Sequence, residues 1–185
     1  MVLPTDTVYG LCADPTTEAP VREIHRLKQR SAEQPIALLA GEVDVLLEFV
    51  PELRRAAPVL RALLPGPYTL ILSNPARRYP WLTGSSPETI GLRVPELRGP
   101  GADVVERVGA VAATSANVHG GSDPRRLEDV PVEVRAGAAA LVDAGELPGT
   151  PSTVLDLSGG EPRVLREGAV AATEALRRAS VALGR

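Results

Sequence analysis

The sequence of 185 residues is long enough for one domain or at most two small ones. Hydrophobic residues make up 44% and charged residues 23%, and no apolar run approaches the ~18 residues that cross a bilayer. A net charge of -3 and an aromatic content of 3% argue against a protein that binds nucleic acid mainly through basic charge and stacking. Cys12 is the single cysteine, which excludes an intramolecular disulfide and a multi-cysteine metal site. We therefore expect a cytoplasmic protein without membrane contact.

Short apolar runs and helical patterns alternate along the chain. Val2-Leu3 predicts the end of a strand that runs into the polar turn Pro4-Thr5-Asp6-Thr7. Thr17 can cap a helix that continues to about Arg30, because apolar residues follow at helical spacing. The remaining expected elements, in chain order, are a strand at 35–39, helices at 42–50 and 53–64, strands at 68–72 and 89–94, a helix at 102–108, a strand at 111–113, a loop with a helical turn at 123–135, a strand at 138–142, a hairpin of strands at 153–157 and 163–165, and a helix at 171–183. This order predicts a mixed α/β single domain.

Two polar segments in the first 30 residues combine groups suited to ligand binding. The turn around Asp6 places two threonine hydroxyls and a carboxylate together, although an ordinary capped turn explains the same residues. Lys28 is the only lysine among 20 cationic residues, and it stands with Arg30 at the predicted end of a helix. The helix dipole favours cations there, so a solvated helix end is the alternative interpretation.

Further polar groups stand at the ends of later strands. Ser115 and Asn117 follow a buried strand, Ser152 precedes another, and Arg93 and Arg166 lie at two more strand ends. Polar groups at strand ends of α/β sheets tend to converge on a ligand site. Together with the two cations of the first helix, these residues predict a cationic, donor-rich site that is poor in general bases. Such a site suits an anionic substrate that carries several phosphates.

Histidines are scarce in this chain. His25 and His119 are the only two, which argues against a zinc site. His25 follows Ile24 on the predicted helix, where a structural or surface role is more common than a catalytic one. His119 follows the turn at 115–117 and is a weaker candidate for the site.

Seven runs of residues, in this order, resemble the YrdC/Sua5 family of threonylcarbamoyl-AMP synthases. They are Pro4-Thr5-Asp6-Thr7-Val8-Tyr9-Gly10-Leu11, Lys28-Gln29-Arg30, Pro65-Gly66-Pro67-Tyr68-Thr69-Leu70, Gly91-Leu92-Arg93-Val94-Pro95, Ser115-Ala116-Asn117, Pro151-Ser152-Thr153-Val154-Leu155-Asp156 and Arg166-Glu167-Gly168-Ala169. The resemblance covers nearly the whole chain. It implies a single YrdC-like domain over residues 1–185, an α/β fold with a twisted mixed β-sheet flanked by helices around a concave cavity.

The resemblance also implies a reaction, in which L-threonine, bicarbonate and ATP form threonylcarbamoyl-AMP and pyrophosphate. This nucleotidyltransferase product serves threonylcarbamoyladenosine formation at position 37 of tRNA. By the same resemblance, the catalytic set falls on Lys28, Arg30, Ser115 and Asn117, the ATP-binding set on Arg30, Gln34, Thr89, Ser115 and Arg166, and the threonine-binding set on Thr7, Arg93 and Ser152. Mg²⁺ is expected with ATP, without a tightly bound metal site in the protein itself. The implied partners are a downstream tRNA threonylcarbamoyltransferase complex and, weakly, tRNA or double-stranded RNA.

The sequence departs from the family pattern in three places. A helix and most of a first strand usually precede the run that begins here at Pro4, so we expect a neighbouring strand to be left partly unpaired. Gln34 stands where relatives often have Lys or Asn, and Asp123 stands where longer relatives place an ATP-contacting serine.

Three alternatives compete with the synthase interpretation. The first is a non-catalytic RNA-binding YrdC-like module, against which the acidic balance and the scarcity of aromatic residues argue. The second is the related carbamoyl-transfer domain of hydrogenase maturation proteins, which are long multidomain chains. The third is a family branch of unassigned activity, which tends to vary around the Pro-Thr-Asp-Thr-Val-Tyr-Gly run that is intact here.

Overall fold

The computed structural model describes residues 1–185 and contains one open sheet of eight strands with helices packed on it. The strands are β1 (Val2–Pro4), β2 (Tyr9–Ala13), β3 (Ala37–Ala40), β4 (Tyr68–Ser73), β5 (Thr89–Arg93), β6 (Ala110–Ser115), β7 (Thr153–Asp156) and β8 (Arg163–Arg166). The helices are α1 (Glu18–Leu27), α2 (Val43–Phe49), α3 (Ala57–Leu63), α4 (Pro80–Thr83), α5 (Pro100–Val108), α6 (Val132–Gly137) and α7 (Ala172–Ala182), with 3-10 turns η1 (Pro51–Ala56) and η2 (Leu127–Asp129).

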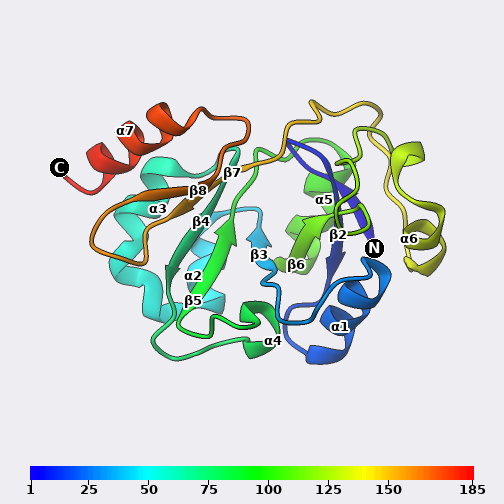
Figure 1. The fold of residues 1–185 in the computed structure, drawn as a ribbon, viewed down its shortest axis with the longest axis horizontal. Coiled ribbons are helices and arrows are strands. Elements are labelled where there is room, and N and C mark those ends of the chain that lie inside the picture. The colour runs from blue at the N-terminus through cyan, green and yellow to red at the C-terminus, as the bar shows by residue number, and fades with distance from the viewer.

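The sheet is mixed, with strand order β1-β2-β6-β3-β5-β4-β7-β8. The β3–β5 and β4–β7 pairs are parallel, and every other neighbouring pair is antiparallel. Figure 1 shows α3 and α7 beside the β4-β7-β8 end of the sheet and α1 beside the β2 end. Strands from both halves of the chain therefore lie next to one another, which brings distant sequence segments to one sheet face.

Alternation along the strands divides the sheet into two different faces. Tyr68, Leu70 and Leu72 of β4 are buried in the main hydrophobic core, as are the corresponding alternate residues of β3, β5 and β6. Apolar residues of α1, α2, α3 and α7 complete this core. On the other face, α5 covers a smaller cluster that includes Leu39 and Val111. The rest of that second face carries small and polar residues, and it forms the wall of a cavity.

Most predicted elements are confirmed within one to three residues at each end. The β2 strand was not predicted, because its sequence Tyr-Gly-Leu-Cys-Ala is almost wholly buried and shows no alternation of polar and apolar residues. The strand predicted at 138–142 is wrong, since only an isolated bridge joins Leu141 to Val2. Thr17 is at the N-cap position of α1, but its side chain makes no capping hydrogen bond.

The expectation of a partly unpaired strand beside the short first strand is wrong, because β2 pairs with β1 from Tyr9 to Leu11 and the Cys12 amide donates to the Met1 carbonyl at 2.8 Å. The outer edge of β1 is paired as well. The Val2 amide donates to the Ala140 carbonyl at 2.8 Å, and the Val142 amide donates to the Val2 carbonyl at 3.0 Å. Next along this segment, the buried Tyr9 hydroxyl accepts a hydrogen bond from the Ala144 amide at 3.0 Å and lies 2.8 Å from Asp143 Oδ1. The segment at 140–145 therefore covers the outer edge of β1. None of the helices has the length and apolar character that a membrane span requires.

Candidate active site

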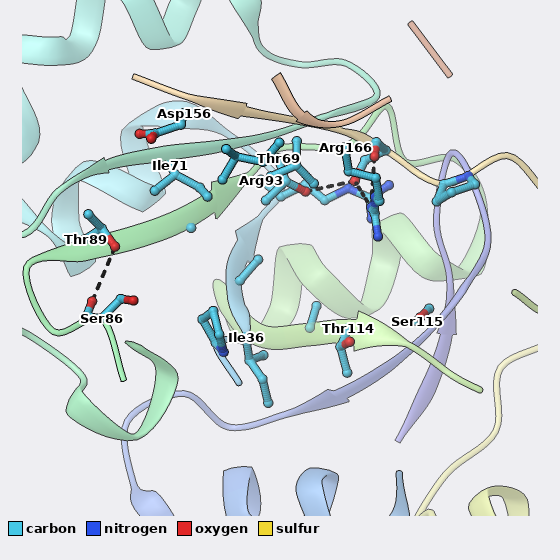
Figure 2. Close-up of a pocket in the computed structure, with 18 of the residues that line it drawn as sticks. Ile36, Thr69, Ile71, Ser86, Thr89, Arg93, Thr114, Ser115, Asp156 and Arg166 are labelled. Atoms are coloured by element: carbon cyan, nitrogen blue, oxygen red, sulfur yellow. Dashed lines mark hydrogen bonds between the residues drawn. The ribbon is translucent and has the colours of Figure 1, made fainter. Parts of the chain in front are cut away.

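A cavity of about 640 Å³ lies over the polar face of the sheet. Thr69 and Ile71 of β4, Gly91 of β5, Ala37 of β3 and Val154 of β7 line its floor. These residues alternate with the core residues of the same strands, so the strand period of two places them on the cavity side. Figure 2 shows Arg93 and Arg166 gathered at one end of the cavity, whereas Thr89, Ser86 and Asp156 lie toward the other.

The structure brings most of the predicted site residues to this cavity. Its wall contains Arg30, Thr89, Arg93, Ser115, Ser152 and Arg166. Thr7, Lys28 and Asn117 stand behind the wall and contact residues that form it. Gln34 is half-buried, and its backbone amide donates to the Ser31 carbonyl in a turn that precedes the lining residue Pro35. The roles of these residues remain predictions, but their convergence is a property of the fold.

Arg93 stands at the end of β5 and is held by the turn that follows β1. Its Nη2 group donates to Asp6 Oδ1 at 2.5 Å and to the Thr7 hydroxyl. The side chains of Arg93 and Asp6 are only 11% and 10% exposed, so this is a largely buried ion pair. The Thr5 hydroxyl donates to the Val8 carbonyl at 2.7 Å and thereby fixes the turn. Arg93 Nε is buried without a partner, so the contacts with Asp6 and Thr7 do not use every donor of this guanidinium.

Arg166 and Ser152 form a second polar group at the same end of the cavity. Arg166 Nη2 donates to the Ser152 carbonyl at 2.9 Å, and the Ser152 and Thr69 hydroxyls lie 2.8 Å apart. Gly168 permits this approach, because a Cβ atom there would lie 2.2 Å from the Pro151 carbonyl oxygen. The end of β8 therefore folds directly over the start of β7 and carries the Arg166 guanidinium to the cavity mouth.

Lys28 is buried, which rules out the alternative interpretation of a cation at a solvated helix end. The residue is 3% exposed, and its Nζ donates to the Ser115 carbonyl, the Asn117 carbonyl and Asn117 Oδ1 at 2.5, 2.7 and 2.8 Å. All three ammonium hydrogens thus have protein acceptors. Burial and the nearby charge of Arg30 lower the pKa of Lys28 to about 8. In this arrangement Lys28 fixes the turn after β6, which in turn presents Ser115 to the cavity.

The two cationic side chains at the end of α1, Lys28 and Arg30, point in different directions. Gln29 adopts a left-handed backbone conformation with φ of 52°, and the Arg30 amide donates to the His25 carbonyl at 3.1 Å. This is the helix-ending geometry in which glycine is usually found. The reversal turns Lys28 inward toward the loop after β6, whereas Arg30 lines the cavity. Burial lowers the pKa of Arg30 to about 10, which still leaves its guanidinium charged at neutral pH.

Several cavity residues were not assigned to the site from the sequence, although Thr69 and Asp156 lie within the runs that resemble the family. Thr69, Asp156 and Arg163 line the wall only because β4, β7 and β8 happen to be neighbours in the sheet. Asp156 is buried and accepts from Arg163 at 2.7 Å and from the Ser158 hydroxyl at 2.6 Å. The signal available in the sequence was the polar residues at alternate positions of β4 and β7. These residues indicate a common polar face only if the two strands are taken as neighbours in the sheet.

The cavity can bind an extended anion and exclude part of the solvent around it. Four arginines reach its wall, namely Arg30, Arg93, Arg163 and Arg166, and three carboxylates offset part of their charge. Hydroxyls of Thr69, Thr89, Ser115 and Ser152 add neutral donors and acceptors. No histidine lines the cavity, so chemistry that needs a histidine base there is excluded. Binding, orientation and charge neutralisation are what these groups supply.

Comparison with known proteins places this cavity in context. The profile of the Sua5/YciO/YrdC family, described as Telomere recombination, matches residues 1–168. A protein of Mycobacterium tuberculosis named putative threonylcarbamoyl-AMP synthase is 33% identical over 174 residues, covering 92% of this chain and 78% of that protein. The structure of Pyrococcus abyssi Sua5 complexed with L-threonine superposes with a TM-score of 0.81 and 29% identity, over 96% of this chain and 52% of that one. Escherichia coli YciO superposes with a TM-score of 0.70 and 26% identity, over 91% and 82%. The chain thus spans about half the length of the archaeal Sua5.

Proposed function

Because the chain belongs to the Sua5/YciO/YrdC family, we propose that it is a threonylcarbamoyl-AMP synthase. Relatives from Bacillus subtilis and Homo sapiens carry the name threonylcarbamoyl-AMP synthase, at 31% and 29% identity over most of this chain. The substrates in this proposal are L-threonine, bicarbonate and ATP, and the products are threonylcarbamoyl-AMP and pyrophosphate. The observation that carries it is the convergence of Arg30, Arg93 and Arg166 with several hydroxyls on one cavity.

The amino acid is proposed to bind at the end formed by Arg93 and Ser152. The carboxylate of threonine would accept from the part of the Arg93 guanidinium that Asp6 and Thr7 leave free. The hydroxyls of Ser152 and Thr69 lie beside this position and can bond the polar groups of the substrate. The published complex of Pyrococcus abyssi Sua5 with L-threonine supports an amino-acid site in this fold.

The reaction needs no strong base in the protein. A carbamate formed from threonine and bicarbonate is an anion, and one of its oxygens can attack the α-phosphorus of ATP. A new oxygen–phosphorus bond then forms, the bond from the α-phosphorus to the bridging oxygen breaks, and pyrophosphate leaves with that electron pair. Arg30 and Arg166 are proposed to neutralise the charge on the phosphates as it shifts.

ATP is proposed to enter as its Mg²⁺ complex, with the ion held mainly by phosphate oxygens as part of the substrate. Asp123 lines the same cavity, near enough to Lys28 and Arg166 for its negative charge to oppose the lowering of their pKa values. Its carboxylate is thus available to a cation that accompanies the phosphates. We further propose that the product passes to a tRNA-modifying threonylcarbamoyltransferase complex, with at most weak direct tRNA binding by this chain.

The proposal is tested by incubating the protein with ATP, threonine and bicarbonate and measuring pyrophosphate and the adenylate product. Pyrophosphate release is expected to require all three substrates, because only the threonine–bicarbonate adduct is the nucleophile. Serine is expected to react less well, by ~1–3 kcal/mol of discrimination for one missing methyl group. Equal release without bicarbonate would overturn the carbamate mechanism. Salt-sensitive RNA binding without any turnover would instead favour the non-catalytic RNA-binding module.

A further inference from the structure

A histidine that the proposed mechanism does not use stands directly behind Arg30. His25 lies on α1, is 5% exposed and does not line the cavity. A polar ring in such a place normally bonds to its surroundings, because an unsatisfied buried group costs free energy. Its Nε2 atom is buried without a partner, so the hydrogen bond at Nδ1 is the one that ties the ring to its surroundings.

The imidazole of His25 accepts a hydrogen bond from the cavity arginine. Arg30 Nε donates to His25 Nδ1 at 3.3 Å, and the Arg30 amide donates to the His25 carbonyl at 3.1 Å. An accepting Nδ1 carries no hydrogen, so the ring is neutral with its proton on Nε2. Burial and the charges of Arg30 and Lys28 lower the pKa of His25, which favours this neutral form.

A second nitrogen of the Arg30 guanidinium has no partner within the protein. This atom is Arg30 Nη2, which is buried. A long arginine side chain loses conformational freedom when it binds a ligand, so holding it beforehand favours binding. The contact between Nε and His25 holds one edge of the guanidinium while the Arg30 side chain lines the cavity.

We propose that His25 is a positioning residue that orients Arg30 for the phosphates of ATP. This inference rests on the proposed function, because it takes ATP as the ligand of Arg30. The competing explanation is that His25 merely fills space between α1 and its neighbours. An apolar ring of similar size would then serve equally well, and this difference can be measured.

The test uses two substitutions that differ in the accepting atom. His25→Phe keeps an aromatic ring but removes the acceptor, whereas His25→Asn places an amide oxygen near the position of Nδ1. The dissociation constants of ATP and of threonine are measured for the whole chain, together with thermal melting. We expect His25→Phe to weaken ATP binding about tenfold, as loss of a hydrogen bond to a charged group does, and to leave threonine binding unchanged. His25→Asn is expected to restore most of the ATP affinity.

A double-mutant cycle separates positioning from a general effect on the fold. In the Arg30→Ala background, His25→Phe is expected to cause no further loss of ATP affinity, because its effect passes through the arginine. Equal loss with and without Arg30, or equal loss of threonine and ATP binding, would overturn the inference. So would unchanged ATP binding by His25→Phe. Failure of the unmodified protein to bind ATP would instead overturn the proposed function.

Discussion

The two cationic parts of the cavity are built in different ways. At the Arg93 end, the guanidinium already has an internal counter-ion in Asp6 and a hydroxyl partner in Thr7. At the α1 end, Arg30 contacts a neutral histidine and has no carboxylate partner, although each guanidinium keeps one unpartnered buried nitrogen. The first arrangement stabilises the protein without ligand but makes a substrate carboxylate compete with Asp6. The second leaves more of the charge for the ligand, at a cost in stability when the cavity is empty.

The largest expected effect comes from breaking the Arg93 ion pair. Arg93→Ala is expected to weaken threonine binding about a hundredfold, because it removes a charged donor of the carboxylate. It also leaves Asp6 buried and unpaired, which should lower the free energy of unfolding by about 3–5 kcal/mol. Denaturant titration and threonine binding are the two measurements.

A second substitution separates the two effects of Arg93. The double variant Asp6→Ala with Arg93→Ala removes both charges, so it should regain most of the lost stability without regaining threonine binding. If the single and double variants are equally stable, Asp6 and Arg93 do not act as a buried pair.

Substitution of Lys28 is expected to have the next largest effect. It tests the hydrogen bonds that Lys28 makes within the protein rather than a contact with a ligand. Lys28→Ala is expected to reduce turnover on the order of a hundredfold, because the turn that presents Ser115 loses its anchor and a small displacement of a positioned group has an effect of this size. Because its three hydrogen bonds are buried, unfolding should also become easier by about 1–3 kcal/mol. Lys28→Met is the matched control, since it keeps most of the side-chain volume without the charge. Wild-type turnover in Lys28→Met would show that the charge is dispensable.

A pH titration sharpens the comparison between the two cationic parts. Because the pKa of Lys28 is about 8, its ammonium loses a proton as the pH rises through 8. One of the three acceptors of Lys28, which belong to Ser115 and Asn117, then loses its hydrogen-bond donor. ATP affinity should therefore fall above pH 8. The unfolded chain, with an ordinary lysine pKa of 10.5, binds more protons than the native state above pH 8. The contribution of Lys28 to the free energy of unfolding should thus rise over the same range.

Isothermal titration with ATP and denaturant titration at each pH measure these two opposite trends. Lys28→Arg serves as the control, because an arginine stays charged throughout and should lack the fall in affinity. ATP affinity that is constant from neutral pH to above pH 9 would contradict the assignment of this pH dependence to Lys28.

The smallest expected effect concerns the residue between Lys28 and Arg30. Gln29 is exposed and has a positive φ, so Gln29→Gly should relieve backbone strain and stabilise the protein by up to about 1 kcal/mol. A shift in Tm of ~2–4 °C is the corresponding thermal readout. Turnover should not change, since glycine keeps the same turn. A lower Tm would show that the Gln29 conformation carries no strain.

The sequence predicted the order of the elements well and their long-range contacts poorly. Periodicity marks α1 and β4 because one side of each is polar, but β2 is buried on both sides and leaves no such pattern. Lys28 was predicted at the site, but the solvated helix end stayed open as an alternative because the sequence does not reveal the loop after β6 that covers this residue. The Asp6–Arg93 pair joins residues 87 positions apart and depends on the strand order. The family resemblance supplied the candidate set, whereas the structure supplied the division into wall residues and residues behind the wall.

The segment that follows α6 and covers the edge of β1, at residues 140–149, limits where the chain can tolerate insertions. Although it contains no regular strand, its backbone is fixed to Val2 at 140–142, to the Tyr9 hydroxyl at 144, and through the Gly149 amide to the Thr7 carbonyl. A loop of this length would ordinarily accept additional residues, but here each lengthening would displace Thr7 or the start of β7. The turn at Gly159-Gly160 is the opposite case, because both glycines are exposed, a Cβ on either would meet no atom within 4 Å, and the one side-chain hydrogen bond there comes from Arg185 near the end of the chain. Limited proteolysis should therefore cut that turn well before the longer segment, and a tag or an added module is better accommodated between β7 and β8.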